Sequence, residues 1–194
     1  DGLIAVVFDA KRDNFRYQIY PDYKANRGET PPELVPQFPL VREATDAFGL
    51  TAIEQEGYEA DDIIAAYAVA AAKQGIQVRI ISSDKDLMQL VDDSHVRLVD
   101  PIKFTLLGPE QVKEKFGVSP DKVVDVQALA GDSSDNVPGV PGIGIKTAAE
   151  LINQFGDLET LLSCTSEIKQ PKRRESLEQN ADKARISKQL VQLA

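Results

Sequence analysis

The first half of this 194-residue chain contains short apolar runs separated by helical patterns, an alternation that is compatible with few folds. Residues 3–8 form a continuous apolar run of the kind that is buried on both faces of a parallel sheet. Val78–Ile81 and Val96–Val99 predict two further strands. Helical patterns at residues 41–48 and Ala60–Lys73 separate the strands, and a glycine follows each. The sequence therefore predicts an α/β core with a mainly parallel sheet flanked by helices.

After residue 103 the pattern changes to short helices. They are predicted at Pro109–Phe116, at residues 120–130, at Ile145–Phe155, at residues 158–162 and in a charged stretch from residue 173 onward. We therefore expect residues 1–103 to form the α/β part and residues 104–194 an all-helical part. Residues 10–40 contain aromatic and basic side chains and closely spaced prolines, which predict a long loop or arch.

Eight carboxylates form four short clusters, each at the edge of an apolar segment: Asp9; Glu59, Asp61 and Asp62; Asp84 and Asp86; Asp132 and Asp135. The net charge of −9 would be −9 + 8 = −1 without them, so the acidity is concentrated in these clusters. Ligand sites of parallel α/β sheets lie beyond the carboxyl ends of the strands, where three of these acids fall. Acids gathered there would repel by about 4 kcal/mol per pair at ~4 Å. We therefore expect a hard cation such as Mg²⁺ between them.

Each cluster taken alone has a structural explanation. Acids are favoured in the first turn of a helix, which accounts for Glu59 to Asp62. Asp84 and Asp86 could cap a following helix, and Asp132 and Asp135 could form an Asx-turn. Their joint occurrence at strand ends and helix starts is harder to explain by capping and favours a shared metal site.

Residues 139–149 contain a second candidate site. Gly142 and Gly144 permit a tight turn, and the helix that follows presents unpaired amide groups suited to a phosphate, with Lys146 adding positive charge. No strand precedes the glycines and their spacing is not that of a nucleotide-binding loop. A hairpin that grips a nucleic-acid backbone without reading bases fits better, with a plain turn between packed helices as the alternative.

The remaining composition adds little. Basic residues exceed acidic ones by three between Lys11 and Arg27 and by four between Lys169 and Lys188, which suits nucleic acid but equally a solvated surface. The single Cys164 cannot form an internal disulfide, and the longest apolar stretch, residues 63–72, is too short to span a bilayer. We expect a cytoplasmic monomer without a membrane partner.

Six motifs in order closely resemble the 5′ nuclease domain at the amino end of bacterial DNA polymerase I, a relative of the flap endonucleases. They are Val7-Phe8-Asp9-Ala10 with Phe15-Arg16, Tyr23-Lys24-Ala25-Asn26-Arg27, Glu59-Ala60-Asp61-Asp62, Ser83-Asp84-Lys85-Asp86-Leu87, Gly131-Asp132-Ser133-Ser134-Asp135-Asn136 and the Gly142-Ile143-Gly144 hairpin. The resemblance implies a PIN-like nuclease core followed by a SAM-like subdomain with a helix-hairpin-helix.

The resemblance also implies roles for individual residues. The eight clustered acids correspond to the family's metal-site acids, which hold two Mg²⁺ ions that Mn²⁺ can replace. Tyr23, Lys24 and Arg27 match the arch that admits a single-stranded 5′ end, and Arg16 is a further expected DNA contact. Gly142, Ile143, Gly144, Lys146 and Thr147 correspond to the hairpin that holds duplex DNA, often with K⁺.

On this basis we expect two-metal phosphodiester hydrolysis of DNA with a 5′ end or flap, in replication and repair. Glu59 and Asp61, with Asp9, would hold the ion that activates water, and Asp84, Asp86 and Asp132 or Asp135 the ion at the leaving oxygen. A polymerase domain would be covalently attached. The family's first strand, with a further metal-site aspartate, precedes everything seen here, and Asp1-Gly2 does not supply it.

Two alternatives come from other classes. A truncated chain would be a structure-specific DNA-binding module with impaired catalysis. An aspartyl phosphatase would also carry an acid pair like Asp84 and Asp86 after a buried strand, but it expects that pair after the first strand and Thr or Val where Met88 stands.

Overall fold

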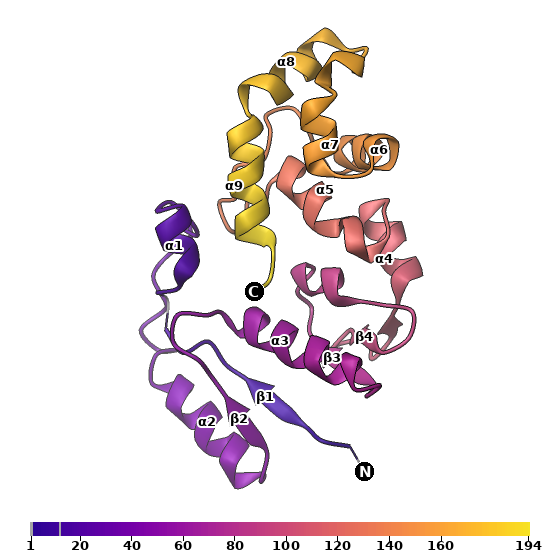
Figure 1. The fold of residues 1–194 in the computed structure, drawn as a ribbon. Coiled ribbons are helices and arrows are strands. Elements are labelled where there is room, and N and C mark those ends of the chain that lie inside the picture. Colours follow the sequence, from indigo (N-terminus) through magenta and orange to yellow (C-terminus); the bar gives the residue numbers. More distant parts are fainter. Residues whose placement is uncertain (1, 12) are drawn as a thin grey trace.

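The computed structural model of the chain describes residues 2–11 and 13–194. A part that contains the strands is followed by a part made of helices, and the helical part extends away from the strands (Figure 1). The predicted order of an α/β core followed by an all-helical part is therefore confirmed. Asp1 and Arg12, the latter counted in the first basic stretch, lie outside the described residues.

The strands form two separate sheets. β1 (Ala5–Val7) pairs in parallel with β2 (Thr51–Ile53). β3 (Val78–Ile81) pairs in parallel with β4 (Val96–Val99), which pairs antiparallel with the short β5 (Leu106–Leu107). Helix α3 (Ala60–Lys73) contacts both β1 and β3, so one helix lies against both sheets.

The prediction that residues 3–8 are buried on both faces of a sheet is wrong. Leu3 and Ile4 are 104% and 66% exposed, and the strand is limited to three residues. β1 has a hydrogen-bonded neighbour on one side only, β2, in a two-stranded sheet. Within the strand Ala5 is exposed and Val6 and Val7 are only half-buried, so elements packed on its two faces do not cover it fully.

Helix α3 forms at the predicted residues because its sequence is rich in alanine and its start is capped. The Glu59 side chain accepts from the backbone of Asp62, and Asp62 Oδ2 accepts from Glu59 N at 3.0 Å, which is a capping box. The helix ends before Gly75, whose φ of +75° suits glycine. This cap fixes the direction in which the acids of the first turn point.

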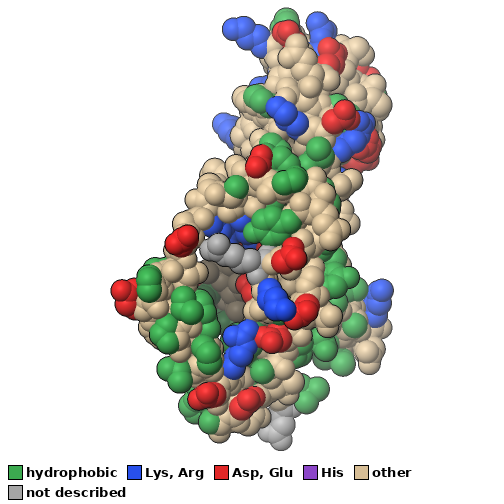
Figure 2. Space-filling view, turned by 90° about the vertical axis from the view of Figure 1, so that its left-hand side faces the viewer, with side chains coloured by type: hydrophobic (Ala, Val, Ile, Leu, Met, Phe, Trp, Pro, Cys, Tyr) green, Lys and Arg blue, Asp and Glu red, His purple; other side chains and the backbone are tan. Residues whose placement is uncertain are grey.

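The predicted loop of residues 10–40 contains a short helix. α1 (Phe15–Ile19) begins at Asn14, whose side chain accepts from Arg16 N. α2 (Gln37–Ala47) begins four residues earlier than predicted and packs against β2. Hydrophobic side chains gather on the lower part of the face shown in Figure 2, and α2 contributes exposed Phe38, Leu40 and Val41.

The helical part is arranged around α5 (Val123–Ala130). Two elements precede α5 in this part and five follow it. They are, in chain order, α4 (Pro109–Phe116) and the 3-10 helix η2 (Pro120–Lys122), then α6 (Ile145–Phe155), α7 (Leu158–Ser163), the 3-10 helix η3 (Thr165–Glu167), α8 (Pro171–Gln179) and α9 (Ala181–Val191). α5 contacts α6, α7 and α9, and its Val123, Val126 and Leu129 are fully buried. The single helix predicted at residues 120–130 is divided into η2 and α5.

Two contacts place the helical part beside the strand-containing part. α9 contacts α1, and α5 contacts the 3-10 helix η1 (Asp86–Leu90), which follows β3. The chain end after α9 returns toward α3 in the middle of the molecule (Figure 1). Among the described residues, no helix combines the length and apolarity needed to cross a bilayer.

Candidate metal centre and nucleic-acid interface

A cavity of about 140 Å³ lies where the two parts meet. Its wall is mainly polar and includes six of the eight predicted acids and all three predicted arch residues: Asp9, Glu59, Asp61, Asp84, Asp86 and Asp135, with Tyr23, Lys24 and Arg27. Figure 2 shows a hollow on this face with acidic and basic side chains at its rim. The fold therefore gathers acids that are up to 126 positions apart, since Asp9 and Asp135 line one cavity.

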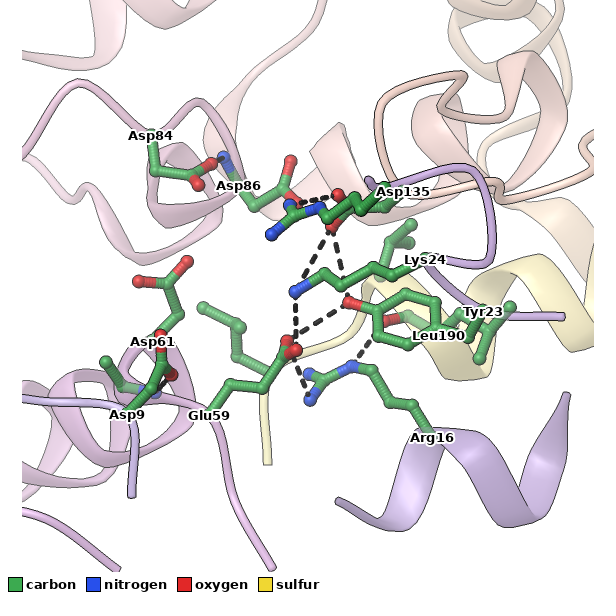
Figure 3. Close-up of a pocket in the computed structure, with 14 residues that line it drawn as sticks. Asp9, Arg16, Tyr23, Lys24, Glu59, Asp61, Asp84, Asp86, Asp135 and Leu190 are labelled. Carbon is green, nitrogen blue, oxygen red and sulfur yellow. Dashed lines mark hydrogen bonds and ion pairs between the residues drawn. The ribbon is translucent and has the colours of Figure 1, made fainter. Parts of the chain in front are cut away.

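Local structure aims the acids at this cavity. Asp9 follows β1, and its Oδ1 accepts from Ala60 N at 2.7 Å, so the end of the strand is tied to the start of α3. Asp84 follows β3, and its Oδ1 accepts from Asp86 N at 2.9 Å. Asp9, Asp61 and Glu59 thus approach from one side and Asp84 and Asp86 from another (Figure 3).

Two of these acids carry raised pKa values. Burial raises the pKa of Asp61 to about 7, and the negative charges of Asp84, Asp86, Glu59 and Asp9 add to the effect. Burial also raises the pKa of Asp86 to about 6, although a hydrogen bond from Gln127 acts in the opposite direction. The site holds more negative charge than its own side chains compensate, which is the environment that attracts a cation.

The basic arch residues bind the acids at the other edge of the cavity. Lys24 Nζ lies 2.5 Å from Glu59 Oε1 and 3.6 Å from Asp135 Oδ2. Arg27 Nη2 lies 2.5 Å from Asp135 Oδ1. The Tyr23 hydroxyl donates to Glu59 Oε2 at 3.0 Å, and burial together with these carboxylates raises the pKa of Tyr23. Lys24 extends between Glu59 and Asp135 in Figure 3.

Asp62 and Arg16 do not take the positions expected of a metal ligand and a DNA contact. Nη1 and Nη2 of Arg16 each donate to Asp62 at 2.7 Å, and Arg16 and Asp62 are 1% and 2% exposed. Burial would raise the pKa of Asp62, but Arg16 outweighs it and holds that pKa below its usual value. Arg16 reaches the cavity wall, 3.5 Å from Glu59, whereas Asp62 does not line the cavity and both of its carboxylate oxygens are already bound.

Asp132 is held apart from the other acids. Its Oδ2 lies 2.7 Å from Lys85 Nζ, and its Oδ1 accepts from the Ser134 hydroxyl at 2.6 Å. Burial would raise the pKa of Asp132, but these partners lower it overall. Asp132 also forms a backbone bridge with Val137, which supports the turn interpretation of this cluster. Of the pair predicted here, the structure brings Asp135 to the cavity and leaves Asp132 bound to Lys85.

The residues that line the cavity fit a hard divalent cation in chemistry. Their donors are carboxylate oxygens, which such ions prefer, and the raised pKa values of Asp61 and Asp86 mark uncompensated charge. In residues 2–11 and 13–194, however, no three acidic, histidine or cysteine side chains stand close enough to enclose one ion. Side-chain movement is therefore needed before the acids can act together as ligands.

The predicted hairpin is present between α5 and α6. Gly142, with φ of +78°, and Gly144 have open space where a Cβ would stand, whereas Ile143 is buried and anchors the turn. Helix α6 begins after Gly144, which has no side chain to cap it, so its first amide groups are free of a side-chain acceptor. Lys146 is exposed and Thr147 half-buried in this first turn.

Sequence reasoning missed several residues that touch the site. Gln127 donates to Asp86, Lys85 binds Asp132, and Asn14 Nδ2 donates to Glu59 Oε1 at 3.1 Å. Lys85 could have been found, because it lies between two of the predicted acids. Gln127 and Asn14 are 41 and 45 residues from their partners, and no local pattern marks them.

Two family models match the chain end to end. Residues 1–117 match the model described as 5′-3′ exonuclease, N-terminal resolvase-like domain, and residues 118–194 match 5′-3′ exonuclease, C-terminal SAM fold. The models meet after residue 117, while the predicted division after residue 103 remains a prediction.

Curated relatives are DNA polymerases I. The chain is 56% identical over 190 residues to DNA polymerase I of Rhizobium leguminosarum, covering 98% of this chain and 19% of that protein. It is 46% identical over 192 residues to DNA polymerase I of Bacillus caldotenax, covering 96% and 22%. The chain thus spans about a fifth of the length of these relatives.

Solved structures have the same fold. One is a bacteriophage T5 5′-exonuclease described with bound divalent zinc ions, which is 25% identical and has a TM-score of 0.84. The match covers 98% of this chain and 74% of the exonuclease chain. A bacteriophage T5 flap endonuclease complex with DNA and metal ions is 24% identical, with a TM-score of 0.84 and the same coverage. At 24% identity, the similarity to the flap endonuclease is evidence for the fold alone.

Proposed function

This chain belongs to the 5′-3′ exonuclease family in both of its halves, and from that premise we propose that it hydrolyses phosphodiester bonds of DNA at 5′ ends and flaps. The observation that carries the proposal is one cavity lined by separate acids and by cationic side chains, of which Lys24 and Arg27 are not bound in the buried pair with Asp62. A carboxylate cluster suits metal-assisted hydrolysis, and adjacent cations suit a phosphate substrate.

The proposed metal ligands are the acids that the cavity brings together. Glu59, Asp61 and Asp9 would hold one divalent ion, and Asp84, Asp86 and Asp135 the other. When bound, such ions lower the pKa of a coordinated water and neutralise charge on the attacking and leaving oxygens. Mg²⁺ is the proposed ion, with Mn²⁺ as a substitute, and the zinc ions named for the bacteriophage T5 5′-exonuclease support a divalent site in this fold.

Lys24 and Arg27 have two roles in the proposal. In the metal-free protein they balance Glu59 and Asp135, so these acids are not left as unpaired charges. Once cations bind the carboxylates, the two side chains are free to contact the scissile phosphate. Their position at one rim of the cavity would direct that phosphate toward the acids opposite, Asp61 and Asp84. Phosphate contacts position a strand without reading its bases, so selectivity would come from the shape of the DNA end.

The hairpin would hold the duplex next to the cleaved strand. The uncapped start of α6 offers amide groups, and Lys146 adds a charge that attracts phosphate. Open space at Gly142 and Gly144 allows a DNA backbone to approach the main chain closely. A K⁺ ion at this turn, and a contact from Thr147, remain predictions.

The polymerase relatives suggest the setting. We propose that the chain is the nuclease part of a DNA polymerase I and removes 5′ segments during replication and repair, including Okazaki fragment processing. The polymerase domain would be a covalent partner and DNA the substrate. Such an enzyme would act as a monomer in the cytoplasm, where bacterial DNA lies.

The test is cleavage of a 5′-flap DNA in Mg²⁺ by the protein and by the double variant Asp84→Ala with Asp86→Ala. We expect the double variant to lose cleavage by at least 10²-fold. The matched control is Glu110→Ala with Glu114→Ala, which removes the same charge from the exposed face of α4 and should cleave normally. Unchanged cleavage by the Asp84 and Asp86 variant would rule out the proposed site.

A second candidate is a DNA-binding module that lacks catalysis. It is favoured by one observation, the absence among the described residues of three acids arranged around one point. Both candidates predict binding to flap DNA, but only the nuclease predicts cleavage that EDTA stops and Mg²⁺ restores. Tight flap binding without any divalent-dependent product would therefore favour the module.

A further inference from the structure

Gln127 is a buried polar side chain in the middle of helix α5. It is 2% exposed, and Val126, Ala128 and Leu129 beside it are fully buried and apolar. Its Nε2 donates to Asp86 Oδ1 at 2.6 Å, across 41 residues and from the helical part to the strand-containing part. Gln127 therefore touches a proposed metal ligand without lining the cavity itself.

The orientation of this amide is fixed by its neighbour. A reversed amide would set its oxygen against the Asp86 carboxylate, and two acceptors facing each other repel. With the amide nitrogen toward Asp86, Gln127 Oε1 is buried and has no hydrogen-bond partner among the described residues. A buried acceptor without a partner reduces stability, and an apolar side chain would suit this helix better. Folding alone thus does not explain a glutamine here.

A second glutamine, Gln89, holds the backbone of the same segment, η1, and so provides a comparison for Gln127. Gln89 Nε2 donates to the backbone oxygens of Asp86 and Val191, at 2.9 and 3.0 Å, and its Oε1 accepts from Leu193 N. Gln89 thus ties the main chain of η1 to the segment after α9. The effect of Gln127 falls on the carboxylate of Asp86 and not on its backbone.

We propose that Gln127 is a positioning residue for the metal centre: it holds the Asp86 carboxylate in the orientation that binds the cation. The proposal rests on the proposed function, because it takes Asp86 as a ligand. Because Gln127 binds only Oδ1 of Asp86, Oδ2 is left for a cation, and Asp86 itself lines the cavity beside Asp84 (Figure 3). The helical part would thereby contribute to metal affinity as well as to DNA binding.

Metal affinity in the absence of DNA provides the test. Outer partners of metal ligands typically change affinity or activity by about 10–100-fold. We expect Gln127→Met to weaken Mn²⁺ binding at least about tenfold in calorimetric titration. The Mg²⁺ concentration for half-maximal flap cleavage should rise similarly, while the rate at saturating Mg²⁺ stays within about threefold. Gln89→Met, which removes hydrogen bonds to the backbone of the same segment, should leave Mn²⁺ affinity within twofold.

The outcomes separate this proposal from the proposed function. Absence of Mn²⁺ binding by the unaltered protein would overturn both. Normal Mn²⁺ binding by a folded Gln127→Met would overturn only the role of Gln127, as would equal weakening by Gln89→Met. If Gln127→Met does not fold, the side-chain amide resonance of Gln127 in the unaltered protein decides. A shift on addition of Mg²⁺ supports the proposal, and an unmoved resonance at saturation overturns it.

Discussion

Arg16 is the largest of the fully buried side chains, and its charge is balanced by Asp62 in a two-point contact. Arg16 Nε also donates to the backbone oxygen of Leu190 at 2.7 Å, so the guanidinium joins α1, α3 and the end of α9. Asp62 Oδ1 in turn accepts from Ala194 N at 3.1 Å. A charge pair with its hydrogen bonds satisfied is tolerated in a core, whereas one partner without the other is costly.

We therefore expect Arg16→Met to lower the free energy of unfolding by about 3–5 kcal/mol, because Asp62 would be left as a buried unpaired charge. Arg42→Met is the matched control. Arg42 also pairs with a carboxylate, Glu54, but these two side chains are 34% and 47% exposed. Its loss should cost less than about 1 kcal/mol. Urea unfolding measures both, and equal effects of the two substitutions would contradict the buried-pair account.

The site was predictable residue by residue only where local sequence determines position. Asp9, Asp84 and Asp86 follow strands, so their place at the cavity could be expected from the strand pattern. Helix geometry alone turns Asp61 about 100° away from Asp62. Which of the two reaches the cavity could not be predicted, because it depends on Arg16, which is 46 residues away from Asp62. Resemblance to a family grouped all eight acids equally, and packing then divided them between the cavity, the buried pair with Arg16 and the turn in which Asp132 binds Lys85.

At the scale of elements, Gly139 and Gly142 differ in what surrounds them although both have positive φ, +60° and +78°. A Cβ on Gly139 would lie 2.5 Å from Gly131 N, whereas one on Gly142 would meet nothing within 4 Å. Val140 N also donates to Leu129 O at 2.7 Å, so the chain after the hairpin's start lies against the end of α5. The backbone contact at Gly139 is what joins α5 to the hairpin.

We expect Gly142→Ala to cost about 1 kcal/mol, the strain of a left-handed backbone for a residue with a Cβ. Gly139→Ala should cost more, roughly 3 kcal/mol or above, since the backbone strands must also separate. The free energy of unfolding in urea distinguishes them. A smaller loss for Gly139→Ala than for Gly142→Ala would show that the close backbone approach is not a constraint.

Lys146 begins helix α6 as an exposed cation next to amide groups without a side-chain cap. If the hairpin grips the duplex backbone, Lys146→Ala should weaken binding of duplex DNA regardless of its sequence. The slope of log affinity against log salt should fall by about 1, the contribution of one phosphate contact. Lys115→Ala on α4, exposed but away from the hairpin, is the control for loss of one positive charge. Equal salt slopes for both variants would argue against a hairpin contact.

Elements with strong local signals matched their predictions, and short ones did not. α3, α6, β3 and β4 form at the predicted residues, because each combines a clear apolar pattern with a defined start or stop. β2 and β5 contain three and two residues, too few for a period to be recognised. α1 was hidden for the same reason, since five residues in an aromatic and basic loop give no helical repeat.

At the scale of the whole molecule, the acidic cavity links stability to pH. The pKa of Asp61 is raised from 3.8 to about 7 and that of Asp86 to about 6, so the folded protein retains protons that the unfolded chain releases near pH 4. Between about pH 4 and 7 the unfolded state therefore binds fewer protons, and stability falls as the pH rises. Asp62 and Asp132 have lowered pKa values and act oppositely: their contribution is lost only as the pH falls below about 4.

The metal-free protein in EDTA should accordingly lose about 1–3 kcal/mol of unfolding free energy between pH 5 and pH 8 through these two acids. Asp61→Asn should remove most of that loss, because an amide carries no charge to bury, and the variant should exceed the unaltered protein in stability at pH 8. Asp182→Asn, at a position whose side chain is 95% exposed, should leave the pH dependence unchanged. Saturating Mg²⁺ at pH 8 should restore stability to the unaltered protein by mass action and do much less for Asp61→Asn. If Asp61→Asn followed the same pH curve as the unaltered protein in EDTA, the repulsion assigned to this cavity would be absent, and with it the physical reason for a cation to bind there.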